Sequence, residues 1–589
     1  MLKQWAQYFS VKNLLATLKR FPLSAISSLA ATILFWNMMT GNGDGDTVFH
    51  WLVLTFNGII LFTALALVEE GKKFRPLVLQ VLALPILYFF ALLNTEGQDT
   101  YGIIYLLENG LVFFGGLGLL FVSPFVFSSQ NRGLWQFMLQ LFIDAIVALA
   151  VGLALGAGLS IALISVENLF ALYSLGNEEM QAIWAVSMIF VTSLVFFTQL
   201  PKDFAHFEKE AIVAENGLKK AIHFFNFPML GLYGLILLAY LAKIAWTWAW
   251  PEGMLALPVL VFSLLGFFTY ALAFAFKNSK DAYGFAFFIR FFPWTILALM
   301  PIYFMALWQR IAEYGVTENR YLGISVGLVL VFWALYFGLS KKQYLKLFPL
   351  SIFAVAFFIA FGPWGVSSVS EKSQVSRLEK ILLENGLLVD GKLQSKSPGE
   401  VPDKNRTEIS AILTYLDQNH GEDAIKSWLP ESLLNSGVTG IYPGSIMKVM
   451  GLDIYYSTYF DSDHLYFSRE SIPYVEVTGF DYVVDVHSDY FDLVGEADIF
   501  IDLSLDSGNN SLNFSFGGES MGVSLDPLLE KFGSFSTSIA NVTEELMTLE
   551  IEGETFRAKL LLDNIDALKL DEGQKQVTHF YGQLLLDVK

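Results

Sequence analysis

The chain has 589 residues, of which 54% are hydrophobic and 15% aromatic, and its formal net charge is −19. Residues 1–368 hold 21 Lys and Arg against 19 Asp and Glu, whereas residues 369–589 hold 16 against 37. A part as acidic as the second is not expected to bind nucleic acid, whose phosphates need a basic surface. Because the sequence has no cysteine, disulfides, thiolate zinc sites and a cysteine nucleophile are excluded.

Residues 1–20 are amphipathic, because Trp5, Phe9 and Leu14 alternate with basic residues. This pattern predicts a helix that lies in the inner membrane interface, with a solvated connector helix as the alternative.

Residues 21–368 form the predicted transmembrane domain. They contain apolar stretches that are each long enough to cross a bilayer, which takes about 20 residues. We therefore predict a membrane all-α bundle of about 11 transmembrane helices, followed by a soluble α+β domain. The predicted spans are 21–40, 50–68, 75–94, 101–127, 140–165, 181–200, 225–246, 254–276, 284–308, 321–340 and 347–368.

The fifth stretch is too long for one crossing, since its apolar character begins near Leu134. We expect Leu134–Ile143 to be an interfacial lead-in, with Asp144 near the cytoplasmic boundary.

Positive charge alternates along the predicted loops. With the N-terminus inside, the inner segments carry 17 Lys and Arg, and the outer loops carry only Arg310 and Arg320. The positive-inside rule therefore places the N-terminus in the cytoplasm, and an odd number of spans places residues 369–589 outside the cytoplasm. The predicted location is the cell (plasma) membrane, as a multi-pass protein.

The soluble part divides where the hydrophobic period changes. Residues 369–430 are predicted to form a helical stalk, with stops at Gly386 and Gly421. Residues 431–589 are predicted to be β-rich and mainly antiparallel, because from about residue 452 the period is two and Gly, Asn, Asp and Ser divide the strands. The stretch SLDPLLEKFG is predicted to be one helix between strands.

Three polar residues in the apolar stretches are candidates for an intramembrane site: Glu108, Asn57 and Gln80. Such residues are costly in lipid, so they indicate a polar cavity, proton path or ligand site. The competing interpretation is a hydrogen-bonded Glu108 that holds helices together. The glycines of spans four and five, Gly115, Gly116, Gly118, Gly152 and Gly156, are explained by close helix packing.

A second candidate lies in the β-rich part, where Asp481, Asp485, His487 and Asp489 alternate in DYVVDVHSDYFD. Alternation puts these side chains on one face of a strand, where carboxylates and an imidazole suit a divalent cation. The competing and favoured interpretation is a solvated strand face.

No sequence motif indicates an enzyme: Walker A, GxSxG, HExxH and a strand-bound GxGxxG are all missing from the sequence. Asp44 and Asp46 lie in an outer loop that is short for a catalytic loop of a lipid-linked transferase. We predict no catalytic residue, no metal and no cofactor.

Several segments resemble a bacterial membrane family catalogued as domain-of-unknown-function family 4153. They are KRFPLSAISSLAATILF, SLVFFTQLPKDF, YGLILLAYLAKIAWTWAWPEG, LWQRIAEYGVTENRYLGI and RLEKILLENGLLVDGKL, and the likeness covers most of residues 15–395. The resemblance implies a multi-pass bacterial membrane protein and no catalytic residues. In the fourth segment, Arg310 and Arg320 are candidates to dock the acidic domain or to bind an anion.

Three functions follow from these observations. The favoured one is an envelope role in sensing, scaffolding or binding a protein partner through the acidic extracytoplasmic domain. The alternatives are transport of a small solute, ion or lipid along Glu108, Asn57 and Gln80, and an enzyme that acts on a lipid-linked substrate at the outer face. The lipid bilayer itself is the other expected partner.

Overall fold

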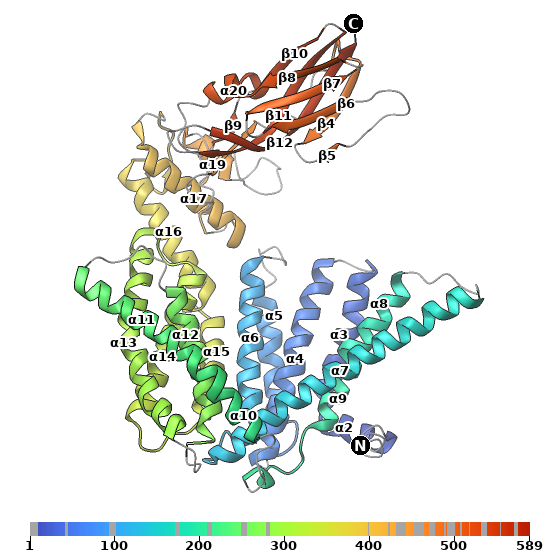
Figure 1. Ribbon diagram of the computed structural model, residues 1–589, viewed down its shortest axis with the longest axis vertical. Coiled ribbons are helices and arrows are strands. Elements are labelled where there is room, and N and C mark those ends of the chain that lie inside the picture. The colour runs from blue at the N-terminus through green and yellow to red at the C-terminus, as the bar shows by residue number, and fades with distance from the viewer. Residues whose placement is uncertain are drawn as a thin grey trace. The chain divides into compact units, whose positions relative to one another are not determined.

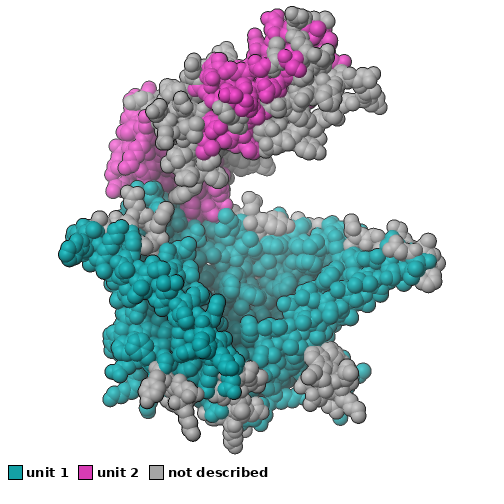
Figure 2. Space-filling model, in the orientation of Figure 1, with its two compact units in different colours: residues 1–374 teal, residues 375–589 magenta. Residues whose placement is uncertain are grey.

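The chain forms two compact units, residues 1–374 and residues 375–589, which Figure 2 shows in teal and magenta. The fold is seen in a computed structural model (Figure 1). It describes residues 10–588 except 42–44, 73, 94–101, 171–176, 209–214, 249–255, 278–282, 398–399, 422–423, 431–442, 453–463, 470–476, 488–489, 492–500, 507–508, 517–518, 532–538, 543, 554 and 570–574.

The first unit is helical. Its α-helices are α2 (Val11–Arg20), α3 (Pro22–Met39), α4 (Gly45–Lys72), α5 (Val78–Leu93), α6 (Ile103–Val122), α7 (Asn131–Phe170), α8 (Asn177–Ala185), α9 (Thr192–Gln199), α10 (Glu215–Ala221), α11 (Phe227–Thr247), α12 (Ala256–Phe274), α13 (Tyr283–Tyr314), α14 (Glu318–Leu339) and α15 (Leu347–Ala360). Short π-helical turns at Val186–Val191 and Ile222–Asn226 join α8 to α9 and α10 to α11.

Each predicted span coincides with a helix, but the count of about 11 is not confirmed. Nine helices in the described part of the chain are long and apolar enough to cross a membrane. The third and eleventh predicted spans coincide with the shorter apolar helices Val78–Phe90 and Leu347–Ala360. These two helices pack against α4 and α6 respectively, so they belong to the same bundle (Figure 1).

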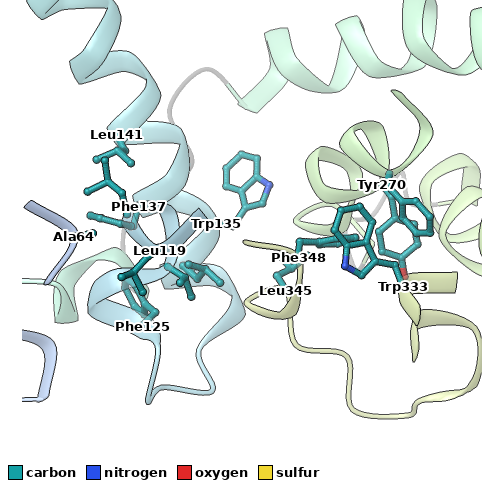
Figure 3. Packing of buried hydrophobic residues seen from close by; sticks show 14 of the residues in the cluster. Ala64, Leu119, Phe125, Trp135, Phe137, Leu141, Tyr270, Trp333, Leu345 and Phe348 are labelled. Atoms are coloured by element: carbon teal, nitrogen blue, oxygen red, sulfur yellow. The ribbon is translucent and has the colours of Figure 1, made fainter. Parts of the chain in front are cut away.

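Helix α7 is longer than the predicted span. The stretch Leu134–Ile143 is the first part of a continuous helix of 40 residues, Asn131–Phe170, and its interfacial position stays a prediction. Leu134, Trp135 and Phe137 are buried in the main hydrophobic core, and Figure 3 shows the last two. The indole Nε1 of Trp135 donates a hydrogen bond to the carbonyl of Ala271 in α12, 3.0 Å away, which draws this end of α7 into the protein.

Helix packing explains the glycines of α6, as predicted. A Cβ at Gly118 would lie 2.7 Å from the backbone oxygen of Pro349 in α15, so the two helices touch through their backbones. Gly115 faces Phe357 of α15, and Gly116 faces Ile60 of α4. Small residues at such positions allow close approach in membranes, where dispersion contacts rather than water drive association.

The glycines of α7 have the same role. A Cβ at Gly152 would lie 2.7 Å from the carbonyl oxygen of Ser187, and one at Gly156 would lie 3.1 Å from the ring of Trp184. The predicted packing role of this pair is confirmed.

The second unit begins with helices. Helix α16 (Val366–Glu384) crosses the unit boundary, and α17 (Asp403–Asn419), α19 (Pro443–Val449) and the short hairpin of β1 (Leu388–Val389) and β2 (Lys392–Leu393) follow it. Gly386 and Gly421 have positive φ, as the predicted helix stops require. Leu382, Ile409 and Leu413 belong to a separate hydrophobic core of this helical part.

The rest of the second unit is β-rich. The strands are β3 (His464–Arg469), β4 (Tyr482–His487), β5 (Tyr490–Phe491), β6 (Ile501–Asp506), β7 (Ser511–Phe516), β8 (Glu519–Ser524), β9 (Ile539–Val542), β10 (Thr548–Glu552), β11 (Phe556–Lys569) and β12 (Lys575–Val588). One sheet has the order β5-β4-β12-β11-β3-β9, with β10 on β11, and a second has the order β6-β7-β8.

The sheets are antiparallel except for the pairing of β3 with β9, so the expected mainly antiparallel domain is confirmed. Helix α20 (Asp526–Lys531) forms where SLDPLLEKFG predicts a helix. Phe467, Phe514 and Phe556 are buried in a core of this part, distinct from the core of the helical part.

Candidate functional site

Asn57 on α4 and Glu108 on α6 are both buried. The Nδ2 of Asn57 donates to Oδ1 of Asn109, 3.1 Å away, and the Nδ2 of Asn109 donates to the carbonyl of Tyr105. Glu108 precedes Asn109 and is 8% exposed. The hydroxyl of Tyr105 in turn donates to the carbonyl of His50, at 3.3 Å. The hydrogen bond from Asn57 to Asn109 therefore joins α4 and α6.

Gln80 lies apart from this pair. Its Nε2 donates to Oε2 of Glu69, 2.8 Å away, at the other end of α4. Glu69 also accepts the backbone N–H groups of Leu77 and Leu79, so this carboxylate caps the start of α5. Since Asn57 and Glu69 are 12 residues apart on one helix, about 18 Å separates the two polar clusters.

A third polar cluster joins segments that are far apart in the sequence. Arg20 donates two hydrogen bonds to the carboxylate of Glu70, at 2.7 and 2.6 Å, and two more to the carbonyls of Leu200 and Pro201. The guanidinium is 12% exposed and the carboxylate 33% exposed. Arg20 thus fixes the end of α2 to α4 and to the segment after α9.

No structural role was predicted for Glu69 or Arg20. The signal for them was present, because LVEEGKKFRP places two acidic residues at the end of an apolar span and KRFP places an arginine at the start of another. A charged residue at the end of an apolar stretch indicates where the span ends. The residues to which it bonds are known only from the fold.

An apolar cavity of about 230 Å³ lies between α4, α6, α7 and α9. Ile60, Leu120, Phe142 and Phe196 are among its lining residues, and its polar atoms come from threonine and serine. Asp144 is adjacent in sequence to the lining residue Ala145 and is buried, at 3% exposed. Its Oδ1 accepts from Gln140 at 2.7 Å.

Arg320 is used inside the first unit. Its Nη1 donates to the carbonyls of Tyr314 and Gly315, which end α13, and its guanidinium lies 5.4 Å from the ring of Tyr314. Arg310 is exposed on α13. Docking of the acidic domain and binding of an anion stay predictions for both arginines.

The α13–α14 loop holds the first turns of α16. Ser373 Oγ accepts the N–H of Val316 at 2.9 Å, and Gln374 Nε2 donates to the carbonyls of Tyr314 and Val316. Ser370 Oγ donates to Oε1 of Glu318 at 2.5 Å. The helix that leads into the second unit is thus fixed, on the side of the first unit, by the segment that contains Arg310 and Arg320.

Asp481 and Asp485 are exposed at one edge of the large sheet. Asp481 precedes β4, and its Oδ2 accepts the N–H of Val588 at 3.0 Å. Asp485 accepts from the amide of Gln583 on β12 at 3.2 Å. His487 ends β4, and Asp489 lies outside the described residues.

In the parts of the chain that the structure describes, no group of three or more His, Asp or Glu is arranged to hold a metal ion. Asp46 is exposed in the first turn of α4, and Asp44 lies outside the described residues.

The comparison with known proteins agrees with the resemblance seen in the sequence. The family model described as Domain of unknown function (DUF4153) matches residues 25–396, which is more than half of the chain, so the chain belongs to that family. It is also 25% identical over 273 residues to an uncharacterized protein of Pasteurella multocida, and the match covers 45% of this chain and 43% of that protein. The chain thus matches less than half of the relative's length. No solved structure matches the chain.

Proposed function

We propose that this member of the DUF4153 family is a polytopic inner-membrane protein that presents its acidic α+β unit outside the cytoplasm for binding a basic protein partner of the cell envelope. The observation that carries the proposal is the charge of residues 453–506. This segment has 13 Asp and Glu, and its only Lys or Arg is Arg469.

Arg469, the basic residue of this segment, is paired inside the protein. It is 6% exposed and its guanidinium pairs with Asp563 on β11 and with Glu544. The basic group of the segment is therefore turned into the protein, while carboxylates such as Asp481 and Asp485 are exposed. A surface of one sign attracts partners of the other sign and discriminates against like-charged ones.

The direction of the unit follows from the distribution of Lys and Arg along the membrane helices. The eleven predicted spans are odd in number, and with α5 and α15 counted as crossings they put residues 375–589 opposite the N-terminus. The positive-inside rule puts the Lys-rich segments, such as the one with Lys341 and Lys342, in the cytoplasm. Both arguments support an extracytoplasmic acidic unit.

The membrane helices support presentation more than transport. Asn57 bonds with Asn109, and Gln80 bonds with Glu69, so the polar side chains that suggested a path are used between helices. Under this proposal Glu108→Gln leaves solute flux through proteoliposomes unchanged, whereas a transporter would lose it.

Binding to a fluorescein-labelled oligolysine peptide tests the proposal. Full-length protein in phosphatidylcholine nanodiscs is titrated by fluorescence anisotropy, and the variant Asp481→Asn/Asp485→Asn is compared with Glu379→Gln/Glu384→Gln. The control removes the same charge from exposed positions of α16.

We expect the β-strand variant to weaken binding several-fold more than the control, with a marked loss of affinity at high salt. Equal effects of the two variants would mean that only net charge attracts the peptide, and the assigned surface would then be wrong.

A further inference from the structure

A second, unrelated pocket lies at one end of the membrane helices. It is an open cavity of about 600 Å³ between the end of α12, the first turns of α13 and the end of α14. Lys277, Arg290, Trp294 and Gln343 are among the residues that line it. Its volume is in the range of ligand pockets, about 300–1,000 Å³.

Among the described residues, the lining of the pocket has two positive groups and no negative one. Neither Lys277 nor Arg290 has a carboxylate partner among the described residues, and each faces an aromatic ring instead. The ammonium of Lys277 lies 3.9 Å from the ring centroid of Phe274, and the guanidinium of Arg290 lies 5.7 Å from that of Phe291. Burial lowers the pKa of Lys277, because loss of water disfavours the charged ammonium.

Apart from Gln343, the uncharged side chains that line the pocket are apolar. Ile289 and Phe337 line it and are 7% and 2% exposed. Exposed apolar side chains then continue along α13 from the pocket, at Phe287, Phe291 and Trp294, with the spacing of one helix face. The ligand that fits therefore has an anionic group and a long apolar part.

The depth of the pocket fits a lipid headgroup. Lys277 follows the end of α12, and Arg290 is six residues after Gly284, where the apolar span begins. At about 1.5 Å per residue this places the guanidinium about 9 Å along the helix, within reach of the interface for a side chain as long as arginine. Basic pockets between membrane helices bind anionic headgroups.

We propose that this pocket binds an anionic phospholipid, with the phosphate between Lys277 and Arg290 and an acyl chain along the exposed face of α13. The phosphate accepts hydrogen bonds from the ammonium and the guanidinium, and Trp294 packs beside the glycerol region. The assignment does not depend on what the acidic unit binds.

Native mass spectrometry of the full-length protein in non-ionic detergent tests this site by counting bound lipids. Dioleoylphosphatidylglycerol and dioleoylphosphatidylcholine are titrated separately into the wild type, into Lys277→Gln/Arg290→Gln and into the matched control Lys341→Gln/Lys342→Gln. The control lysines are exposed and do not line the pocket.

We expect the wild type to prefer phosphatidylglycerol by about tenfold, and the pocket variant to lose that preference while the control keeps it. If the control loses it equally, or if the wild type shows none, surface charge rather than a pocket attracts the lipid and the proposal is wrong.

Two further arms keep the result clear. Ala286 is exposed and lines the pocket, so Ala286→Glu should fold and should abolish the preference by supplying a carboxylate to the two cations. An unchanged preference contradicts the site.

Competition with inorganic phosphate is the second additional experiment. If millimolar phosphate displaces the lipid and raises the melting temperature of the wild type but not of the pocket variant, the ligand is a soluble phosphate and the lipid assignment is overturned.

Discussion

Helices α4 and α6 differ from helices α7 and α11 in how much of each is covered by protein. In α4 and α6, 61% and 56% of the most apolar stretch is buried, against 22% in the helices that contain α7 and α11. Figure 1 shows the latter two running obliquely, whereas α4 and α6 are upright. Hydropathy is similar in the four helices, so it does not distinguish a central helix from a lipid-facing one.

Polar side chains mark the difference better than hydropathy does. The central pair contains Asn57, Glu69 and Asn109, each bonded to another segment. In α11 the ammonium of Lys243 lies 5.7 Å from the ring of Tyr240, a neighbour on its own helix. Because lipid offers no hydrogen-bond partner, polar groups gather where other helices supply one. Changes at the central helices should therefore cost more stability than changes at the lipid-facing ones.

The largest effect is expected at Arg20. Arg20→Ala leaves the carboxylate of Glu70 and two backbone carbonyls without their donor, which should lower the free energy of unfolding by about 3 kcal/mol. Thermal unfolding in detergent, followed by the fluorescence of the 13 tryptophans, measures the change.

Arg20→Lys is the informative companion, since it keeps the charge but not the two-pronged geometry. It should recover only part of the loss. Full recovery would show that charge alone holds the three segments together.

An intermediate effect is expected at Gly118. Gly118→Ala puts a methyl group against the backbone of α15 and should destabilise the protein by about 1–3 kcal/mol. Gly110 in the same helix has no heavy atom within 4 Å of an added Cβ. Gly110→Ala is therefore the control, and it should be neutral or stabilising by up to about 1 kcal/mol. Similar melting temperatures for the two variants would contradict the close contact of α6 with α15.

The smallest effect is expected for the Asn57–Asn109 pair. Hydrogen bonds between membrane helices contribute modestly, so a double-mutant cycle of Asn57→Leu and Asn109→Leu should give a coupling of about 0.5–1.5 kcal/mol. Chemical unfolding in mixed micelles measures each corner of the cycle. A coupling of zero would mean that the two amides are independent, and the transport interpretation of Asn57 would regain support.

Sequence alone predicts the positions of the membrane helices, because a bilayer sets their length and polarity. It does not predict the burial of Leu134, Trp135 and Phe137, since a protein core and lipid are both apolar and only the partner segment, here Ala271 of α12, distinguishes them. The full length of α7 is not predictable for the same reason.

In the second unit the period of two predicts most strands, and Gly386 and Gly421 predict helix stops. The order of the strands is not predictable in this way. Strand β12 pairs with β4 about a hundred residues earlier, and nothing local records that partner.

The candidate site residues also differ in how much of their role the sequence predicts. Glu108 and Asn57 are recognisable as polar residues in apolar stretches, and both are buried. Glu69 and Arg20 are visible as charged residues at span ends, but their partners are not predictable, because the fold brings Glu69 to the N–H groups of α5 and Arg20 to Glu70 and the carbonyls after α9.

Cysteine accessibility tests the central claim, the extracytoplasmic position of the acidic unit, most directly. The chain has no cysteine, so each single-cysteine variant has one thiol that the reagent can label. Val389 is 48% exposed in the second unit, and Arg75 is exposed in a segment assigned to the inside. A membrane-impermeant maleimide should label Val389→Cys in intact spheroplasts and Arg75→Cys only after lysis. Labelling of Arg75→Cys but not of Val389→Cys in intact spheroplasts would contradict the account.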